Sequence, residues 1–154
     1  MEPKIVQREA FAVAGLELRC RMGEPDAIPQ LWQRSFAHMN EIQGLTEPGI
    51  SYGVMYNYDE ATEAWDYLAG YAVESGAPLP EGMTRKEIPA QRYAVFTCTM
   101  PTIQETYDAI YQEWLPQSGY EHAPTPEFER YGQSFNPNDP TSQFEIFVPL
   151  QEKE

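Results

Sequence analysis

The feature that most constrains the fold is an internal repeat, because the second half of the chain follows the pattern of the first. At an offset of 79 residues, Tyr52-Gly53 aligns with Tyr131-Gly132. The same offset aligns Leu31, Trp32, Gln33 and Phe36 with Ile110, Tyr111, Gln112 and Leu115, and Trp65 with Phe144. Further upstream, an offset of 82 brings Phe11-Ala12-Val13 onto Tyr93-Ala94-Val95. A repeat of this kind predicts two copies of one supersecondary unit that bury a common core.

Each copy has the pattern strand, helix, strand, strand. Long extended segments are expected at 5–21 and 86–100, and hairpins at 50–71 and 128–150. Apolar residues at spacings of three and four predict helices at 28–39 and from Thr102 to Pro116, with Thr102 and Glu105 as a capping box. The pattern predicts one α+β domain over residues 1–154, with βαββ units at about 3–73 and 85–150 and a linker at about 74–87.

The chain is rich in aromatic residues, which make up 13% of it, and ten of them are Tyr. Because side chains alternate along a strand, three rows of residues are expected to share faces of the hairpins. These rows are Ile50, Tyr52, Val54 and Tyr56; Trp65, Tyr67, Ala69 and Tyr71; and Glu129, Tyr131, Gln133 and Phe135. If the sheets of the two copies join, the rows converge near the pseudo-twofold axis and line a cleft for a ligand. The alternative is that these rings form ordinary core.

One acidic residue departs from the repeat, since Glu129 aligns with Ile50. In one interpretation Glu129 faces solvent at a sheet edge or pairs with Arg130 or Arg92. In the other it lies in an aromatic pocket, where burial raises its pKa and a flat organic cation relieves the cost of its charge. Each good cation–π contact there would contribute roughly 0.5–2 kcal/mol.

Composition excludes several other functions. A net charge of −14, with ten basic residues against 24 acidic ones, leaves no basic face for nucleic acid, and a DNA mimic would need ordered rows of carboxylates. Neither a membrane span nor a signal peptide is present, so a cytoplasmic location is expected. Cys20 and Cys98 are expected as reduced, packed thiols, and we expect no metal site and no cofactor.

Four sets of motifs cover nearly the whole chain and resemble the GyrI-like small-molecule-binding domains. These domains also form the C-terminal modules of some AraC-type and MerR-type transcription regulators. The motifs are Tyr52-Gly53 with Ala69-Gly70-Tyr71-Ala72-Val73; Pro80-x-Gly82-Met83 with Ile88-Pro89-Ala90-x-x-Tyr93-Ala94-Val95-Phe96; Thr106-Tyr107-x-x-Ile110-Tyr111-x-Glu113-Trp114-Leu115-Pro116-x-Ser118-Gly119-Tyr120; and Pro126-x-Phe128-Glu129-x-Tyr131 with Phe144-Glu145-Ile146-Phe147-Val148-Pro149.

The resemblance implies two pseudo-twofold-related, SHS2-like βαββ units with an antiparallel sheet. It also implies that both helices cover one face of the sheet and that ligands bind in a cleft on the other. It implies further that Glu129 matches the buried acid that meets lipophilic cationic drugs in multidrug-sensing regulators. The ligand-binding residues expected on this basis are Glu129, Tyr52, Tyr56, Trp65, Tyr67, Tyr71, Tyr107, Tyr131 and Phe147. The chain begins directly on its first predicted strand, so a stand-alone domain without a helix-turn-helix is expected.

Two alternative functions follow from the same resemblance. Some similar stand-alone proteins hydrolyse reactive, cyclopropane-bearing toxins, and here Glu129 would be the general base with Tyr71 or Tyr107 polarising the substrate. The other alternative is an interaction with a protein partner such as gyrase. Binding of small lipophilic, cationic molecules is the function that the sequence favours.

Overall fold

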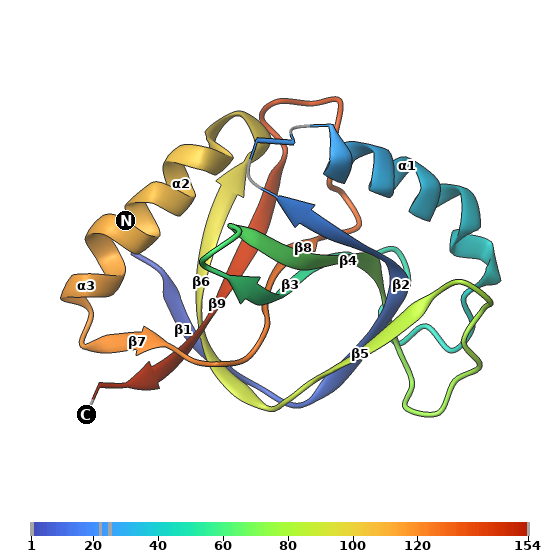
Figure 1. Ribbon diagram of the computed structural model, residues 1–154, viewed down its shortest axis with the longest axis horizontal. Coiled ribbons are helices and arrows are strands. Elements are labelled where there is room, and N and C mark those ends of the chain that lie inside the picture. The colour runs from blue at the N-terminus through green and yellow to red at the C-terminus, as the bar shows by residue number, and fades with distance from the viewer. Residues whose placement is uncertain (1, 22, 25, 154) are drawn as a thin grey trace.

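The computed structural model describes residues 2–21, 23–24 and 26–153 and is shown in Figure 1. Its two main helices are α1 (Ala27–His38) and α2 (Ile103–Ala109). The π-helical turn Ile110–Trp114 and the short α3 (Leu115–Gln117) extend α2. The strands are β1 (Lys4–Arg8), β2 (Phe11–Arg21), β3 (Ser51–Asp59), β4 (Ala64–Val73), β5 (Thr84–Ile88), β6 (Gln91–Thr99), β7 (Tyr120–His122), β8 (Glu127–Tyr131) and β9 (Gln143–Glu152). The predicted α+β class, with an antiparallel sheet and two helices, is confirmed.

The sheet is internally symmetric about its two central strands. Its order is β1-β6-β9-β8-β3-β4-β2-β5, with β7 added beside β9. Strands β8 and β3 meet at the centre, β9 and β4 flank them, and β6 and β2 follow on either side. The order thus reads the same from both ends when each strand is replaced by its repeat equivalent, as a pseudo-twofold axis between β3 and β8 requires.

The long first strand predicted for each unit is broken in both copies, and the second unit contains the short β7 in addition. The breaks fall at residues 9–10 and 89–90. In the second copy the break includes Pro89, which has no amide hydrogen to donate to a ladder. Beyond the break the chain changes partners, so β1 pairs with β6 of the other unit and β5 pairs with β2.

Both helices pack on one side of the sheet through equivalent residues. Leu31 of α1 and Ile110 after α2, which the repeat aligns, are both fully buried. Thr102 is the N-cap residue of α2, as predicted. Its reciprocal capping partner is Thr99 rather than Glu105, because Thr102 Oγ1 accepts a hydrogen bond from the Thr99 backbone N–H at 3.3 Å.

The face of the sheet that is turned away from the helices is filled by side chains. Strands from both ends of the sheet contribute to one apolar cluster there, with Val6 on β1 and Ile88 on β5 both packed in it. The sheet therefore curls until its two ends close over this face, as the sweep of β1, β2, β5 and β6 in Figure 1 shows. The predicted position of the cleft, on the face away from the helices, was wrong because that face encloses a core.

The repeat alignment of the central strands was also wrong in its register. Tyr52 pairs with Arg130, and Gly53 pairs with Glu129. Tyr52 belongs to the core on the face away from the helices, whereas Tyr131 packs on the helix side. An odd offset exchanges the two faces of a strand, so an offset of 79 cannot relate equivalent residues here.

Candidate functional site

A large cavity of about 1840 Å³ opens between the two helices, above the central strands. Its walls come from α1, from α2 and the π-helical turn that follows it, and from β3, β4 and β8. The end of β3 with the start of the turn that follows it, at 57–60, and the loop at 132–138 also line the cavity. The volume exceeds the roughly 300–1,000 Å³ that is typical of ligand sites, so the cavity has room for a bulky molecule.

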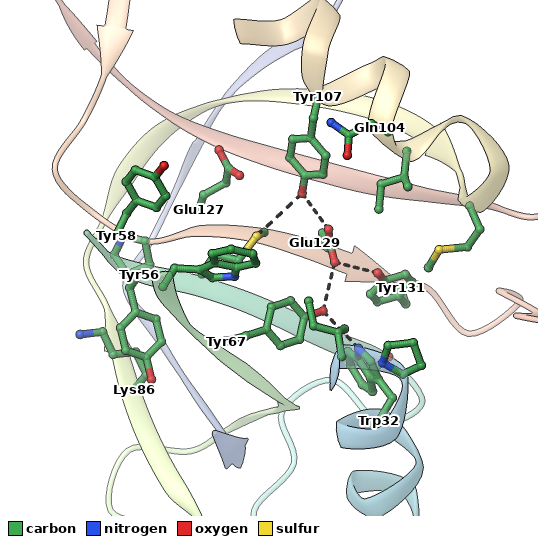
Figure 2. A pocket seen from close by; sticks show the side chains of 18 of the residues that line it. Trp32, Tyr56, Tyr58, Tyr67, Lys86, Gln104, Tyr107, Glu127, Glu129 and Tyr131 are labelled. Carbon is green, nitrogen blue, oxygen red and sulfur yellow. Dashed lines mark hydrogen bonds between the residues drawn. The ribbon is translucent and has the colours of Figure 1, made fainter. Parts of the chain in front are cut away.

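Glu129 lies in the floor of this cavity with 5% of its surface exposed. Three tyrosine hydroxyls donate hydrogen bonds to its carboxylate, as Figure 2 shows. Tyr131 and Tyr67 donate to Oε1 at 2.8 and 3.1 Å, and Tyr107 donates to Oε2 at 2.7 Å. Tyr107 comes from α2, Tyr67 from β4 and Tyr131 from β8, so both halves of the repeat contribute.

Burial and hydrogen bonding act on the pKa of Glu129 in opposite directions. Desolvation raises the pKa above its ordinary value, and the hydrogen bonds from the three tyrosines lower it again in part. The pKa values of the three tyrosines are also shifted. Burial and the nearby carboxylate raise the pKa of Tyr67, Tyr107 and Tyr131 well above 10. All three phenols therefore stay protonated at neutral pH and keep donating to Glu129.

Gly53 makes this arrangement sterically feasible. A Cβ atom at position 53 would lie 2.1 Å from the Tyr67 hydroxyl oxygen and 3.2 Å from Glu129 Oε1. With no side chain there, the Tyr67 ring lies over β3 and reaches Glu129. Trp32 of α1 fixes the same ring from the other side, since its indole N–H donates to the Tyr67 hydroxyl at 3.1 Å.

A second acid lies on the same strand face two residues earlier. Glu127 is 8% exposed and also lines the cavity. The Tyr111 hydroxyl donates to its Oε1, and His122 Nε2 lies 3.4 Å from the same oxygen. Burial, with a smaller contribution from the charge of Glu129, raises the pKa of Glu127 to about 8. Burial also lowers the pKa of His122.

The structure brings most of the predicted ligand residues into this cavity. Besides Glu129 and its three tyrosines, Tyr56, Trp65 and Tyr71 line it. Trp65 and Thr125, which also line the cavity, each have a buried polar atom without a hydrogen-bond partner among the described residues, the indole Nε1 and the hydroxyl Oγ1.

Two predicted residues, Tyr52 and Phe147, lie outside the cavity. Both belong to the core on the face away from the helices. The Tyr52 hydroxyl accepts a hydrogen bond from Arg8 at 2.8 Å and donates one to Glu47 at 2.7 Å. The prediction failed for them because side-chain alternation sorts residues into two faces without indicating which face carries the ligand.

The arginines that could have neutralised Glu129 are engaged elsewhere. Arg130, its neighbour in sequence, points to the opposite face and pairs with Glu47 at 3.3 Å and Glu145 at 3.5 Å. Arg92 pairs with Glu152 at 3.8 Å. Both alternatives for Glu129, exposure at an edge and pairing with an arginine, are therefore wrong.

Several residues of the site were missed by sequence reasoning. Trp32 fits the apolar periodicity of its helix, which does not distinguish a core position from a cavity wall. Glu127, in contrast, was predictable from the sequence, because side-chain alternation along β8 places it on the same face as Glu129 and Tyr131. Gly53 was noted only as part of a motif, and its role depends on the approach of Tyr67 from another strand.

The hydrogen bonds to Glu129 predict a measurable effect on its ionisation. In Tyr107→Phe the carboxylate loses one donor, so we expect the pKa of Glu129 to rise further. Tyr71→Phe is the matched control, since Tyr71 contacts the sulfur of Met39 at 3.7 Å and not Glu129. NMR titration of ¹³C-labelled carboxyl groups measures the pKa of Glu129 in both variants. An unchanged Glu129 titration in Tyr107→Phe would contradict the assigned hydrogen bond.

An α+β fold with internal twofold symmetry and an aromatic, acid-bearing cavity at its centre has the features of a ligand-binding domain. The chain belongs to the GyrI-like family, because the model of the GyrI-like small molecule binding domain matches residues 1–151. It is also 40% identical over 153 residues to the transcriptional regulator BrlR of Pseudomonas aeruginosa. That match covers 97% of this chain and 56% of BrlR, so the chain spans about half the length of this relative.

Solved structures share the fold at low sequence identity. The structure of SAV2435 bound to tetraphenylphosphonium has a TM-score of 0.75 at 15% identity and covers 98% of this chain and 94% of that one. A putative transcription regulation protein from Staphylococcus aureus MU50 has a TM-score of 0.73 at 16% identity. The match covers 98% of this chain and 99% of that one. The EcmrR C-terminal domain has a TM-score of 0.71 at 15% identity. The match covers 99% of this chain and 98% of that one.

The described part of the chain lacks both a metal-binding cluster and a membrane-spanning helix. No group of three or more His, Cys, Asp or Glu side chains there is arranged to hold a metal ion. Within the same residues, no helix has the length and apolar character needed to cross a membrane. Cys20 and Cys98 are buried free thiols, as predicted.

Proposed function

We propose that the cavity binds lipophilic organic cations that carry aromatic rings, with Glu129 as the counter-charge. The observation that carries this proposal is a buried carboxylate surrounded by aromatic rings, whose only hydrogen-bond partners among the described residues are neutral phenols. Such a charge is costly in an apolar environment, and a cation that enters the cavity relieves the cost. The rings that hold Glu129 add cation–π attraction.

Two further observations support a cationic ligand. The net charge of −14 attracts cations to the protein at long range. The structurally similar SAV2435 was solved with tetraphenylphosphonium, a lipophilic cation with four aromatic rings. A cavity of about 1840 Å³ accommodates a molecule of that size.

The contacts of Glu129 favour binding over hydrolysis. A general base needs a lone pair directed at water, and three tyrosine hydroxyls already occupy three of the roughly four acceptor positions of the Glu129 carboxylate. Each of these bonds stabilises the carboxylate and weakens it as a base. Tyr71, one of the two tyrosines considered for catalysis, does not hydrogen-bond to it.

The direct test compares two ions of the same shape and opposite charge, tetraphenylphosphonium and tetraphenylborate. Binding is followed by quenching of tryptophan fluorescence, because Trp32 and Trp65 line the cavity. We expect the phosphonium to bind with a Kd on the order of 10 µM and the borate not to saturate. Glu129→Gln should weaken phosphonium binding at least about tenfold, ~1.4 kcal/mol.

A matched control removes an equal charge elsewhere. Glu121 lies exposed on β7, and Glu121→Gln should leave the phosphonium affinity within about twofold of wild type. Equal affinity for the two ions, or full affinity in Glu129→Gln, would refute the proposal.

A further inference from the structure

We propose that Glu127 forms a second cation subsite beside Glu129, so that the cavity selects dications whose charges lie about 7 Å apart. The inference rests on the proposed function, because it assigns a second charge-binding position within the same cavity. The two acids are alternate residues of β8, and successive residues on one face of a strand are separated by about 7 Å.

The two acids form parallel pairs with two tyrosines on the facing helix. Tyr107 donates to Glu129, and Tyr111, four residues further, donates to Glu127. The rings of Tyr107 and Tyr111 stack with centroids 6.5 Å apart and planes within 8°. The π-helical turn that begins at Ile110 carries Tyr111, and such turns are frequent at functional sites. A flat ligand lying along β8 would meet a carboxylate and a phenol at each position.

Glu127 retains an oxygen that the protein does not use. Its side chain is nine-tenths buried, and both of its contacts, Tyr111 and His122, are made by Oε1. Oε2 has no hydrogen-bond donor among the described residues, although the side chain lines the cavity. Both oxygens of Glu129, in contrast, accept hydrogen bonds. A cationic group is the partner that this free oxygen lacks.

The surroundings of Glu127 hold a proton that a cation can replace. His122 Nδ1 lies 2.6 Å from the Ala123 carbonyl oxygen and must carry hydrogen, so in the neutral ring Nε2 faces Glu127 without one. The proton that Glu127 holds below its pKa of about 8 lies beside this bare nitrogen, 3.4 Å from Oε1, and it leaves when a positive charge takes its place. The other charged groups of the cavity are Glu129, Asp108, Glu60 and Lys86, whose ammonium lies 4.6 Å from the centre of the Tyr56 ring.

This proton gives the subsite a pH dependence of known sign. Because the pKa of Glu127 is about 8, a dication must displace the proton below that pH and meets a ready carboxylate above it. Affinity for a permanent dication should rise up to tenfold per pH unit from pH 6 and level off above about pH 8. The affinity for a monocation held at Glu129 should rise much less over the same pH range.

The test uses 1,4-bis(trimethylammoniomethyl)benzene and the matching monocation, 4-methylbenzyltrimethylammonium, which have the same ring and do not titrate. Isothermal titration at pH 8.5 should show the dication binding at least about tenfold more tightly than the monocation. At pH 6.5, titrations in buffers of different ionisation enthalpy should show release of about one proton per dication bound. In Glu127→Gln the preference should fall to about twofold or less and the proton release should vanish, while Glu121→Gln should match wild type.

The outcomes separate this inference from the function on which it rests. Monocation binding that depends on Glu129, without a preference for the dication or with a preference that survives Glu127→Gln, overturns the second subsite alone. Failure of both ions to bind in a Glu129-dependent manner overturns the proposed function and the subsite with it. A free energy of unfolding of the unliganded protein that falls from pH 5 to 8, and does so less in Glu127→Gln, supports the proton on Glu127 independently of any ligand.

Discussion

Phe128→Ala is expected to lower the free energy of unfolding by about 4 kcal/mol. Phe128 is fully buried at the centre of the core on the face away from the helices. Its ring contacts four others, with centroid distances of 4.6 Å to Phe147, 5.1 Å to Tyr93, 5.4 Å to Phe11 and 5.6 Å to Tyr52. Truncation would remove these contacts and leave a cavity that rigid strands cannot fill.

Urea unfolding followed by fluorescence measures this loss. The urea concentration at the midpoint of unfolding should fall. The dependence of the free energy of unfolding on urea should stay unchanged, because unfolding exposes the same amount of surface in the variant. Tyr58→Ala is the control, because Tyr58 is 61% exposed and its loss should change stability by no more than about 0.5 kcal/mol. A loss below about 1 kcal/mol in Phe128→Ala would show that this face is not closed into a core.

Gly53→Ala is expected to weaken both the fold and the binding of tetraphenylphosphonium. The new methyl group would lie 2.1 Å from the Tyr67 hydroxyl oxygen and 2.7 Å from its ring carbon Cζ, so the ring must move. The displaced Tyr67 would lose its bonds to Glu129 and Trp32. We expect a stability loss of about 1–3 kcal/mol and, because the cavity floor is rebuilt, at least about tenfold weaker binding.

Two further variants isolate the cause of this effect. Gly132→Ala meets no atom within 4 Å and has no positive φ, so its stability should change by less than about 1 kcal/mol. In the double variant Gly53→Ala/Tyr67→Leu the clash is gone, so part of the stability should return while binding stays weak. If Gly53→Ala alone binds tetraphenylphosphonium like wild type, binding does not depend on the observed position of Tyr67.

Local patterns predicted the elements well because they depend on neighbours in sequence. The three-and-four spacing that includes Leu31 and Ile110 identified both helices, and both residues are buried against the sheet. Alternation correctly grouped Trp65, Tyr67 and Tyr71 on one face of β4. The acid at position 129 was identified as unusual, and it does lie buried among tyrosines.

The errors concern relations between distant segments. The assignment of Tyr52 and Phe147 to the ligand required knowing which face of the sheet stays open, and curling of the sheet decides that. The curl depends on β1 and β5 crossing to the opposite units, which no local pattern encodes. The repeat alignment failed in the central strands for a related reason, since a one-residue difference in register exchanges inside and outside.

The crossing of β1 and β5 has a consequence for how such a molecule could have arisen. Neither half holds the strand that completes its own side of the sheet, because each takes it from the other. A chain with one copy of the unit could therefore complete its sheet only by exchanging its first strand with a second chain. A strand-swapped homodimer of half-length chains is the simplest forerunner of this architecture, and joining the two genes would preserve every pairing at the cost of one linker.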